Sequence, residues 1–437
     1  MLARMIYDVL VIGAGPAGLH AAMVAAEAGA KTLLLERMDQ AGRKLLASGS
    51  GQCNITHTGT VEEFLEHYGS ANKQGAARFL KPALYAFSNT DLEAWMAARG
   101  LPLETTEAGK LFPRSRRARD VRELFVNEAR EAGTEIKADS RVLSVERAEG
   151  LFVVHASQAA PKAETSFQAR CLVLACGGAS WPATGSSGDG CAIARSLGQH
   201  CVVEGPALAP AIVEEMGWRH FVSCAGIALR DRNISLYRNE KCIGEGAGDV
   251  LFTHRGLSGP GILDLSRDMR PGDTIRIPLA GDPALLEGPE HADGKLRALL
   301  EAHGKRSILR IVSELSVPET LARALLEVLG IDSALNAASL SRAQRLALAG
   351  GLARPGQPFL LAALGSWNEA MATRGGVDLT AVNAKTMESR SIPGLFFAGE
   401  VLDYDGDTGG YNIQAAISTG RLAGACAAIG AAESRTD

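Results

Sequence analysis

Residues 42–54, GRKLLASGSGQCN, combine two cations, two serines, an amide pair and a thiol with several glycines. Glycines allow backbone amides to approach a ligand closely, and Lys and Arg neutralise phosphates. Hydroxyl and amide groups donate to ligand oxygens. The segment therefore predicts a loop that binds an anionic, oxygen-rich ligand, and no G-x4-GK[ST] phosphate loop is present. The ligand-binding residues predicted here are Arg43, Lys44, Ser48, Gly49, Gly51, Gln52, Cys53 and Asn54. We interpret Cys53 as a small packing residue and not as a nucleophile.

The residues before this segment read as strand, glycine turn, helix and strand. An apolar run at 9–12 precedes Gly13-x-Gly15-x-x-Gly18, an alanine-rich helix extends to Gly29, and KTLLLE ends at Glu36. In such a unit the glycines shape the turn and admit a pyrophosphate at the helix N-terminus, while the acid accepts from a ribose. This predicts a dinucleotide site and does not separate NAD from FAD, since both contain ADP. The predicted residues are Gly13, Ala14, Gly15, Pro16, Ala17, Gly18, Glu36 and Arg37.

A second unit near the C-terminus favours FAD. A short apolar strand at 395–398 precedes an acid, an aspartate-containing loop and a Gly-Gly pair that begins a helix. The acid suits a ribityl hydroxyl, and the helix N-terminus would stabilise the negative charge of a reduced flavin. The predicted residues are Gly399, Glu400, Asp403, Gly409, Gly410, Tyr411, Asn412 and Ile413. We also expect the segment 373–376 to line the edge of the ring.

A third unit, CLVLACGGAS at 171–180, is an apolar strand closed by two glycines, which we expect near the adenine half of the cofactor. Cys171 and Cys176 flank this strand and point to opposite faces, so we expect no disulfide between them. The eight cysteines contain no C-x-x-C and no zinc spacing, so no metal site is predicted. The predicted residues are Val142, Ala175, Cys176, Gly177 and Gly178.

Together these segments resemble the aminoacetone-oxidase-like (BaiN-type) family of bacterial FAD flavoproteins, a branch of the glutathione-reductase-like superfamily. The matching segments are VIGAGPAGL (11–19), GRKLLASGSGQCN (42–54), LVLACGGAS (172–180), GSSGDG (185–190), LFTHRGLSGPGIL (251–263), RGGVDL (374–379) and TMESRSIPGLFFAGEVLDYDGDTGGYNIQAA (386–416). Two positions depart from the family pattern. Gln52 stands where the family tends to have Arg, and Ser50 stands where it tends to have Gly.

The chain organisation predicts an α/β fold with a discontinuous Rossmann-like FAD-binding domain. Its first part is expected at residues 1–196 and its second part at 369–437. Residues 197–368 are expected to form an inserted substrate-side domain, β-rich and barrel-like, followed by a small helical subdomain. RNISLYRN and DTIRIPLAG alternate as strands do, and the pattern becomes helical from about residue 295 to 350. The family resemblance implies the same plan.

We expect a cytoplasmic protein with a small-molecule substrate and with neither a nucleic acid nor a membrane as partner. The net charge is −4, the pI is near 6.2 and 46% of the residues are hydrophobic, which argues against wholesale nucleic-acid or membrane binding. RSRRAR at 114–119 is the exception. It could contact RNA phosphates or form a solvated turn, and both interpretations stay open. The oligomeric state is also left open.

No second strand–GxGxxG–helix unit follows, so hydride must come from an organic substrate or from NADPH or NADH entering transiently. Both routes use flavin N5. His254 and Arg255 precede a glycine turn and are predicted as proton carrier and anion clamp, with Tyr411 as a third catalytic residue. The sequence predicts an FAD-dependent oxidoreductase, either reducing an enone or imine with NAD(P)H or oxidising an amine or alcohol with dioxygen. The alternatives are a flavin-containing RNA-binding protein like those of tRNA modification, and a flavin redox sensor without turnover.

Overall fold

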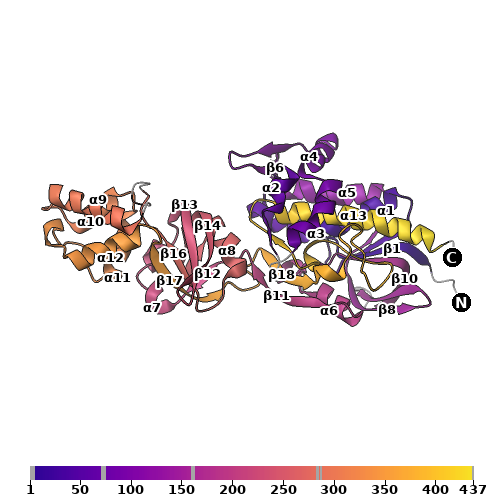
Figure 1. The fold of residues 1–437 in the computed structure, drawn as a ribbon. Helices are drawn as coiled ribbons and strands as arrows, with labels where there is room; N and C mark the ends of the chain where they lie inside the picture. Colours follow the sequence, from indigo (N-terminus) through magenta and orange to yellow (C-terminus); the bar gives the residue numbers. More distant parts are fainter. Residues whose placement is uncertain (1–4, 70–74, 159–162, 282–284, 286–287, 436–437) are drawn as a thin grey trace. The chain divides into compact units, whose positions relative to one another are not determined.

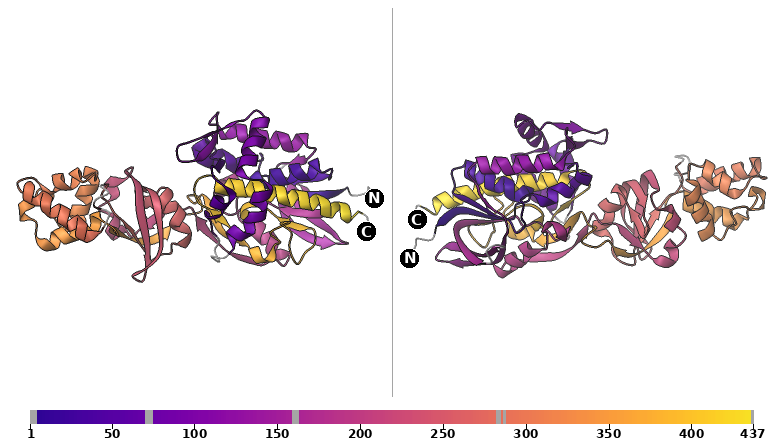
Figure 2. Two further views of the ribbon diagram at one scale, coloured as in Figure 1. Left: turned by 45° about the horizontal axis from the view of Figure 1, so that its top comes forward. Right: turned by 180° about the vertical axis from the view of Figure 1, so that it is seen from behind.

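The computed structural model describes residues 5–69, 75–158, 163–281, 285 and 288–435. It divides the chain into two compact units, shown in Figures 1 and 2. Unit 1 comprises residues 1–206 and 371–437, and unit 2 comprises residues 207–370. The domain boundaries expected from the sequence were 196/197 and 368/369.

Unit 1 is built on a seven-stranded sheet with the order β7-β2-β1-β10-β9-β8, and β19 pairs with β10. Strands β7, β2, β1, β10 and β19 run parallel, whereas β9 and β8 continue from β10 as an antiparallel meander. The strands are β1 (Ile6–Ile12), β2 (Thr32–Leu35), β7 (Glu135–Lys137), β8 (Ser140–Ala148), β9 (Leu151–Gln158), β10 (Ala163–Leu174) and β19 (Leu395–Phe397).

The register aligns the carboxyl ends of four parallel strands. Ile12 pairs with both Leu35 and Leu174, and Leu174 pairs with Phe397. The residues that follow these strands therefore meet at one edge of the sheet, where open α/β folds bind their ligands. That edge receives the glycine turn, Glu36, the 175–178 segment and Gly399–Glu400.

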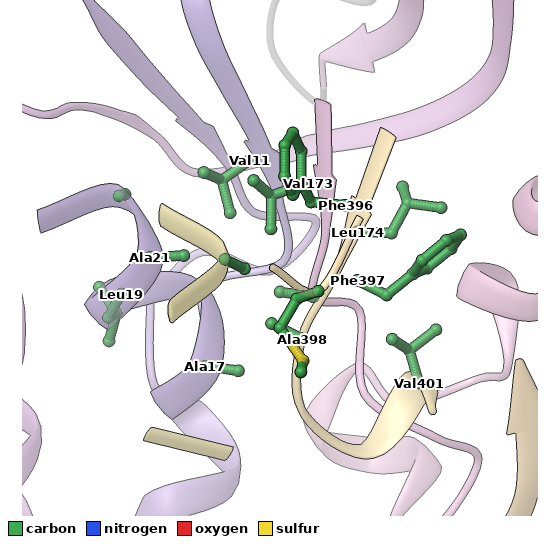
Figure 3. Packing of buried hydrophobic residues seen from close by; sticks show 14 of the residues in the cluster. Val11, Ala17, Leu19, Ala21, Val173, Leu174, Phe396, Phe397, Ala398 and Val401 are labelled. Carbon is green, nitrogen blue, oxygen red and sulfur yellow. The ribbon is translucent and has the colours of Figure 1, made fainter. Parts of the chain in front are cut away.

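Two helices, α1 (Pro16–Glu27) and α13 (Tyr411–Glu433), pack against each other over the parallel strands. Figure 3 shows apolar side chains of α1 among those of β1, β10 and β19. A Cβ atom at Gly420 would lie 2.2 Å from the Ala17 carbonyl oxygen, and one at Gly424 would lie 2.1 Å from that of Ala21. Glycine at both positions lets the helix backbones touch. Among the described residues, α13 alone is long and apolar enough to cross a membrane, and its burial against α1 accounts for that composition.

The other elements of unit 1 cover the sheet and carry short hairpins. They are β3 (Thr56–His57), α2 (Val61–Leu65), β4 (Tyr68–Gly69), α3 (Ala76–Ala86), α4 (Asn89–Ala98), β5 (Leu103–Thr105), β6 (Lys110–Pro113), α5 (Ala118–Glu131), α6 (Asp189–Ser196), β11 (Cys201–Ala207), β18 (Ala372–Val377) and β20 (Asp405–Gly406). Strands β11 and β18 pair with each other in a separate two-stranded sheet.

Unit 2 contains a closed barrel of the strands β12-β15-β14-β13-β16-β17, so the predicted barrel-like insert is confirmed. Its core includes the rings of Trp218, Phe221, Phe252 and Phe359, which lie 5.1–6.1 Å apart between centroids. The strands are β12 (Ala211–Val213), β13 (Ala228–Arg238), β14 (Lys241–Phe252), β15 (Gly256–Ser258), β16 (Thr274–Ile277) and β17 (Gln357–Leu364). The helices are α7 (Glu215–Trp218), α8 (Pro260–Leu265), α9 (Pro289–Ala302), α10 (Ile308–Glu314), α11 (Glu319–Val328) and α12 (Arg342–Leu352).

His20 on α1 is a buried titratable group within the helical layer of unit 1. Its ring is fully enclosed and lies 4.6 Å from the Phe125 ring and 5.3 Å from that of Trp95, between centroids. Burial holds the pKa of His20 well below 6.5, and the charges of Arg421 and Arg99 lower it further. His20 is therefore neutral in the folded protein at pH values where an unfolded histidine is already protonated.

We expect this burial to make the protein less stable as the pH falls through about 6.5, because the unfolded chain then binds a proton that the folded chain refuses. The contribution is absent above that pH and grows by up to about 1.4 kcal/mol per pH unit below it. In His20→Leu this proton uptake by the unfolded chain is lost. The free energy of unfolding, measured with urea between pH 7.5 and 5.5, should therefore decrease less steeply as the pH falls. His254→Gln, at an exposed histidine, is the control. An unchanged slope in His20→Leu would contradict the assignment.

Candidate cofactor-binding site

Glu400 joins four segments at the carboxyl edge of the sheet. Its Oε2 accepts from Lys44 Nζ at 2.7 Å, and its Oε1 accepts from the Thr373 backbone N–H at 2.7 Å and from Ser180 Oγ at 3.2 Å. Lys44 Nζ also donates to Ser180 Oγ at 2.7 Å. The side chains of Lys44 and Glu400 are 27% and 20% exposed, so the pair is only partly screened by water. The predicted loop at 42–54 and the C-terminal unit are thus brought together by one ion pair.

Thr373 fixes the glycine end of β10. Its Oγ1 accepts from the backbone N–H groups of Ala179 at 2.9 Å and Ser180 at 3.2 Å. A Cβ atom at Gly178 would lie 2.2 Å from Thr373 Oγ1, so glycine is required for this approach. Ser180 was not among the predicted residues. Its position two residues after Gly178, at the end of CGGAS, is the signal that could have identified it.

The glycine turn after β1 shows which glycines serve packing and which serves a ligand. A Cβ atom at Gly18 would lie 1.8 Å from the Gly13 carbonyl oxygen, and one at Gly13 would lie 2.5 Å from that of Ala175. Gly15 differs, because its φ of −74° suits any residue and nothing lies within 4 Å of a Cβ built there. Neither conformation nor packing requires glycine at 15. The space beside it fits the close backbone approach of a pyrophosphate.

Glu36 holds the glycine turn in place. Its Oε2 accepts from the Ala14 N–H at 2.9 Å, and its Oε1 accepts from the Met38 N–H at 2.9 Å. Burial raises the pKa of this carboxyl, and the backbone donors oppose the increase. Arg37, the next residue, forms an ion pair with Asp189 at 3.1 Å. The predicted contact of Glu36 with a ribose stays a prediction.

The loop at 42–54 is strained where it is richest in glycine. Gly49, Ser50 and Gly51 have φ values of 54°, 55° and 85°, a left-handed conformation that favours glycine. Ser50 adopts this conformation without the freedom of the glycine that the family tends to have. Ser48 Oγ donates to the Leu45 carbonyl at 2.6 Å, which stabilises the bend. Burial raises the pKa of the Cys53 thiol to about 11, so this thiol is protonated at neutral pH.

The flanks of this loop are held by arginines. Arg43 forms an exposed ion pair with Asp39 at 3.2 Å. Arg116 Nη1 donates to Gln52 Oε1 at 3.3 Å, and its guanidinium lies 4.3 Å from the centroid of the Phe112 ring. Within the RSRRAR segment, Arg116 also forms an ion pair with Glu104, and Arg117 forms one with Asp120. Half of this arginine cluster is therefore engaged by neighbouring side chains.

Two helix N-termini lack their own anionic or side-chain cap. Neither α1 nor α13 has a capping side chain or an acidic residue in its first turn. Helix N-termini carry a partial positive charge, and neither helix offsets it with an acidic side chain in its own first turn, so both ends favour bound anions. Gly409 and Gly410 precede α13 with φ values of 136° and 99°, and a Cβ atom at Gly410 would lie 2.6 Å from the Thr56 backbone nitrogen.

Tyr411 begins α13, and its ring is buried between two imidazoles. The ring centroid lies 4.2 Å from that of His67 and 5.2 Å from that of His57. Asn412 bonds to both backbone groups of Gly406, accepting at 2.8 Å and donating at 2.7 Å. These contacts position the Gly-Gly helix start. The catalytic role predicted for Tyr411 stays a prediction.

The remaining predicted residues fall into two groups. His254 and Arg255 lie in unit 2, between β14 and β15, where the His254 carbonyl accepts from Trp218 Nε1 and Arg255 pairs with Glu369. Cys176 is at the edge of unit 1, and burial raises its thiol pKa to about 12. The others lie in unit 1; they are Pro16, Ala17, Asn54, Val142, Ala175, Cys176, Gly177, Asp403 and Ile413. The described residues contain no cluster of three or more His, Cys, Asp or Glu able to hold a metal ion.

Residues 7–426 match the family model described as the HI0933-like protein Rossmann domain. The chain belongs to this family. The family binds FAD, and the protein is an FAD-dependent oxidoreductase with the predicted α/β Rossmann-like fold. The open space at Gly15 and the two uncapped helix N-termini fit that cofactor.

Three curated relatives are similar over nearly their whole length. The ribosomal RNA dihydrouridine synthase of Escherichia coli (strain K12) is 29% identical, covering 96% of this chain and 97% of the relative. The enzyme of the same name from Haemophilus influenzae is 30% identical, with 94% and 96% covered. The 3-dehydro-bile acid delta(4,6)-reductase of Clostridium scindens is 30% identical, with 96% and 98% covered.

Two solved structures share the fold. A 3-ketosteroid-delta4-(5alpha)-dehydrogenase from Rhodococcus jostii RHA1 has a TM-score of 0.53 at 18% identity, and 98% of each chain is covered. A flavocytochrome c3 fumarate reductase has a TM-score of 0.51 at 17% identity, covering 98% of this chain and 79% of that one. At these identities the likeness concerns the fold.

Proposed function

We propose that the protein reduces a carbon–carbon double bond conjugated to a carbonyl group, with NADPH or NADH as the electron source. The observation that carries this proposal is the agreement between the names of full-length relatives. Dihydrouridine synthesis saturates a ring double bond of uracil, and a delta(4,6)-reductase saturates ring double bonds of a 3-oxo bile acid. In both substrates the double bonds that are saturated are conjugated to a carbonyl group. A hydride adds to the β-carbon and a proton to the α-carbon, while the nicotinamide is oxidised.

When bound, FAD supplies a carrier that accepts a hydride from the nicotinamide and passes it to the substrate at N5. The chain's own contribution is binding and electrostatics. The α1 N-terminus and the open backbone at Gly15 suit the pyrophosphate, and the uncapped α13 N-terminus suits the negative charge of the reduced ring. The Lys44–Glu400 pair links the loop at 42–54 to the segment that follows β19.

We propose a small cyclic enone as the substrate, because unit 2 contains no excess of basic residues. Residues 207–370 contain 18 Lys and Arg against 19 Asp and Glu. RNA binding relies on an excess of cations that contact phosphates. Arg116 and Arg117 of unit 1 are already engaged by Glu104 and Asp120. The second candidate is uridine within RNA, which the two dihydrouridine synthase relatives favour.

The test is anaerobic stopped-flow spectroscopy of the purified yellow protein. We expect NADPH or NADH to bleach the flavin absorbance, and a cyclic enone such as 2-cyclohexenone to restore it with one saturated product per flavin. Restoration by a uridine-containing ribosomal RNA transcript, and not by the enone, would select the second candidate. Restoration by dioxygen alone, or no bleaching by either nicotinamide, would contradict the reductase proposal.

A further inference from the structure

Two cysteines that belong to no recognised sequence motif lie close together near the carboxyl edge of the sheet. Cys191, in the first turn of α6, is 1% exposed, and Cys201, the first residue of β11, is half-buried. Cys201 Sγ donates to the Cys191 carbonyl oxygen at 3.7 Å, so the two residues are in direct contact. Both cysteines are free.

A helix end and a tight turn hold these thiols together. After α6, Gly198 adopts a φ of 85°, and the N–H of Gln199 donates to the Ala194 carbonyl at 2.9 Å. The chain therefore reverses and brings β11 back along the helix. The Gln199 side chain donates to Ser391 Oγ at 2.9 Å and accepts from Ser389 Oγ at 3.2 Å, which anchors the turn.

The two thiols differ in reactivity. The interaction with Cys191 lowers the pKa of Cys201, partial burial opposes this effect, and the charge of Arg195 lowers the pKa further. Glu204 and Asp378 act in the opposite direction. The contact with Cys201 and burial raise the pKa of Cys191. Cys201 is thus both the more accessible thiol and the one more readily deprotonated, as an attacking cysteine must be.

We propose that Cys191 and Cys201 form a redox-active dithiol that is oxidised to an intramolecular disulfide by low-molecular-weight disulfides. The Cys201 thiolate attacks the disulfide, forming a mixed disulfide and releasing one thiol. Cys191 then loses its proton and attacks Cys201 Sγ, which closes the protein disulfide and releases the second thiol. One disulfide is reduced to two thiols, and two protein thiols are oxidised.

The disulfide would link α6 to β11 within unit 1. The N–H of Gly188, which precedes α6, donates to the Gly178 carbonyl at 3.2 Å, and a Cβ atom at Gly190 would lie 3.0 Å from Cys176 Cβ. The helix so linked packs on the glycine end of β10, which Thr373 also fixes. Closing this short loop should raise the melting temperature by roughly 5 °C.

The test is incubation of the holoenzyme with excess oxidised glutathione, followed by alkylation and peptide mass mapping. We expect a Cys191–Cys201 cross-link and the loss of two of the eight alkylatable thiols. The melting temperature should rise in the oxidised protein and return after reduction. A wild-type protein that keeps all eight thiols free would overturn the proposal.

Three variants test which cysteine attacks the disulfide first. Cys191→Ser should trap glutathione on Cys201, because no second thiol is present to release it. Cys201→Ser should acquire neither the cross-link nor a comparable adduct on Cys191. Cys242→Ser, at an exposed lone cysteine, is the control and should cross-link like the wild type. Trapping at Cys191 in Cys201→Ser, with none at Cys201 in Cys191→Ser, would overturn the assigned order of attack.

Discussion

Gly15→Ala will leave the fold of the apoprotein intact and weaken FAD binding on the order of 10- to 100-fold, or about 1.4–2.8 kcal/mol. The added methyl group meets no protein atom within 4 Å, and the φ of −74° at this residue is open to alanine. The methyl group instead occupies the space that a pyrophosphate needs. Urea unfolding of the apoprotein and fluorescence titration with FAD measure the two effects separately.

Gly18→Ala is the matched control, three residues further along the same turn. Its Cβ atom would lie 1.8 Å from the Gly13 carbonyl oxygen, which is backbone and has little room to move. Here the apoprotein itself should lose about 3 kcal/mol or more of its free energy of unfolding. If Gly15→Ala destabilises the apoprotein as much as Gly18→Ala, or binds FAD like the wild type, the assignment of Gly15 to the cofactor is wrong.

Glu400→Gln should lower the free energy of unfolding of the apoprotein by about 2 kcal/mol. The substitution leaves Lys44 Nζ without a countercharge in a partly buried position and weakens the acceptor for the Thr373 N–H and for Ser180. The measurement is denaturant unfolding of the apoprotein. In the double variant Lys44→Met/Glu400→Gln the loss should be smaller than the sum of the single losses, by about 1 kcal/mol.

The Arg43–Asp39 pair provides the control for this prediction. Arg43 directly precedes Lys44 in the sequence, but its ion pair lies on the surface. Its side chains are 42% and 60% exposed, and Asp39→Asn should change stability by less than about 0.5 kcal/mol. Equal losses in Asp39→Asn and Glu400→Gln, or strict additivity in the double variant, would show that Glu400 does not join the segments as described.

The local backbone requirements of the cofactor edge could be predicted from the sequence. The order of strand, glycine turn and helix at 9–27 follows from residue types alone, because the strained turn, the close packing at Gly18 and the apolar strands all act over short distances. The parallel arrangement of these strands is consistent with apolar runs that are buried on both faces of the sheet. The barrel-like insert was also predictable from alternation in its strands.

The contacts that assemble the site could not be predicted in the same way. Lys44 and Glu400 are 356 residues apart. From residue types alone we expect Lys44 to bind phosphates and Glu400 to bind a ribityl hydroxyl, whereas the structure pairs the two side chains with each other. Ser180 and the Cys191–Cys201 contact were missed for a related reason. A lone serine or a C-x9-C spacing matches no known motif. Whether such residues contact each other depends on the turn that brings the following segment of the chain back beside the preceding one.

The sequence alone determined the class of fold, the cofactor and the glycine turns, because each rests on backbone geometry and burial periodicity within a few residues. Only the tertiary structure decided which charges pair, which thiols meet and which glycine faces empty space. Side-chain partners across the sheet edge are selected by strand register and helix packing. Those are properties of the whole folded chain, and no short segment encodes them.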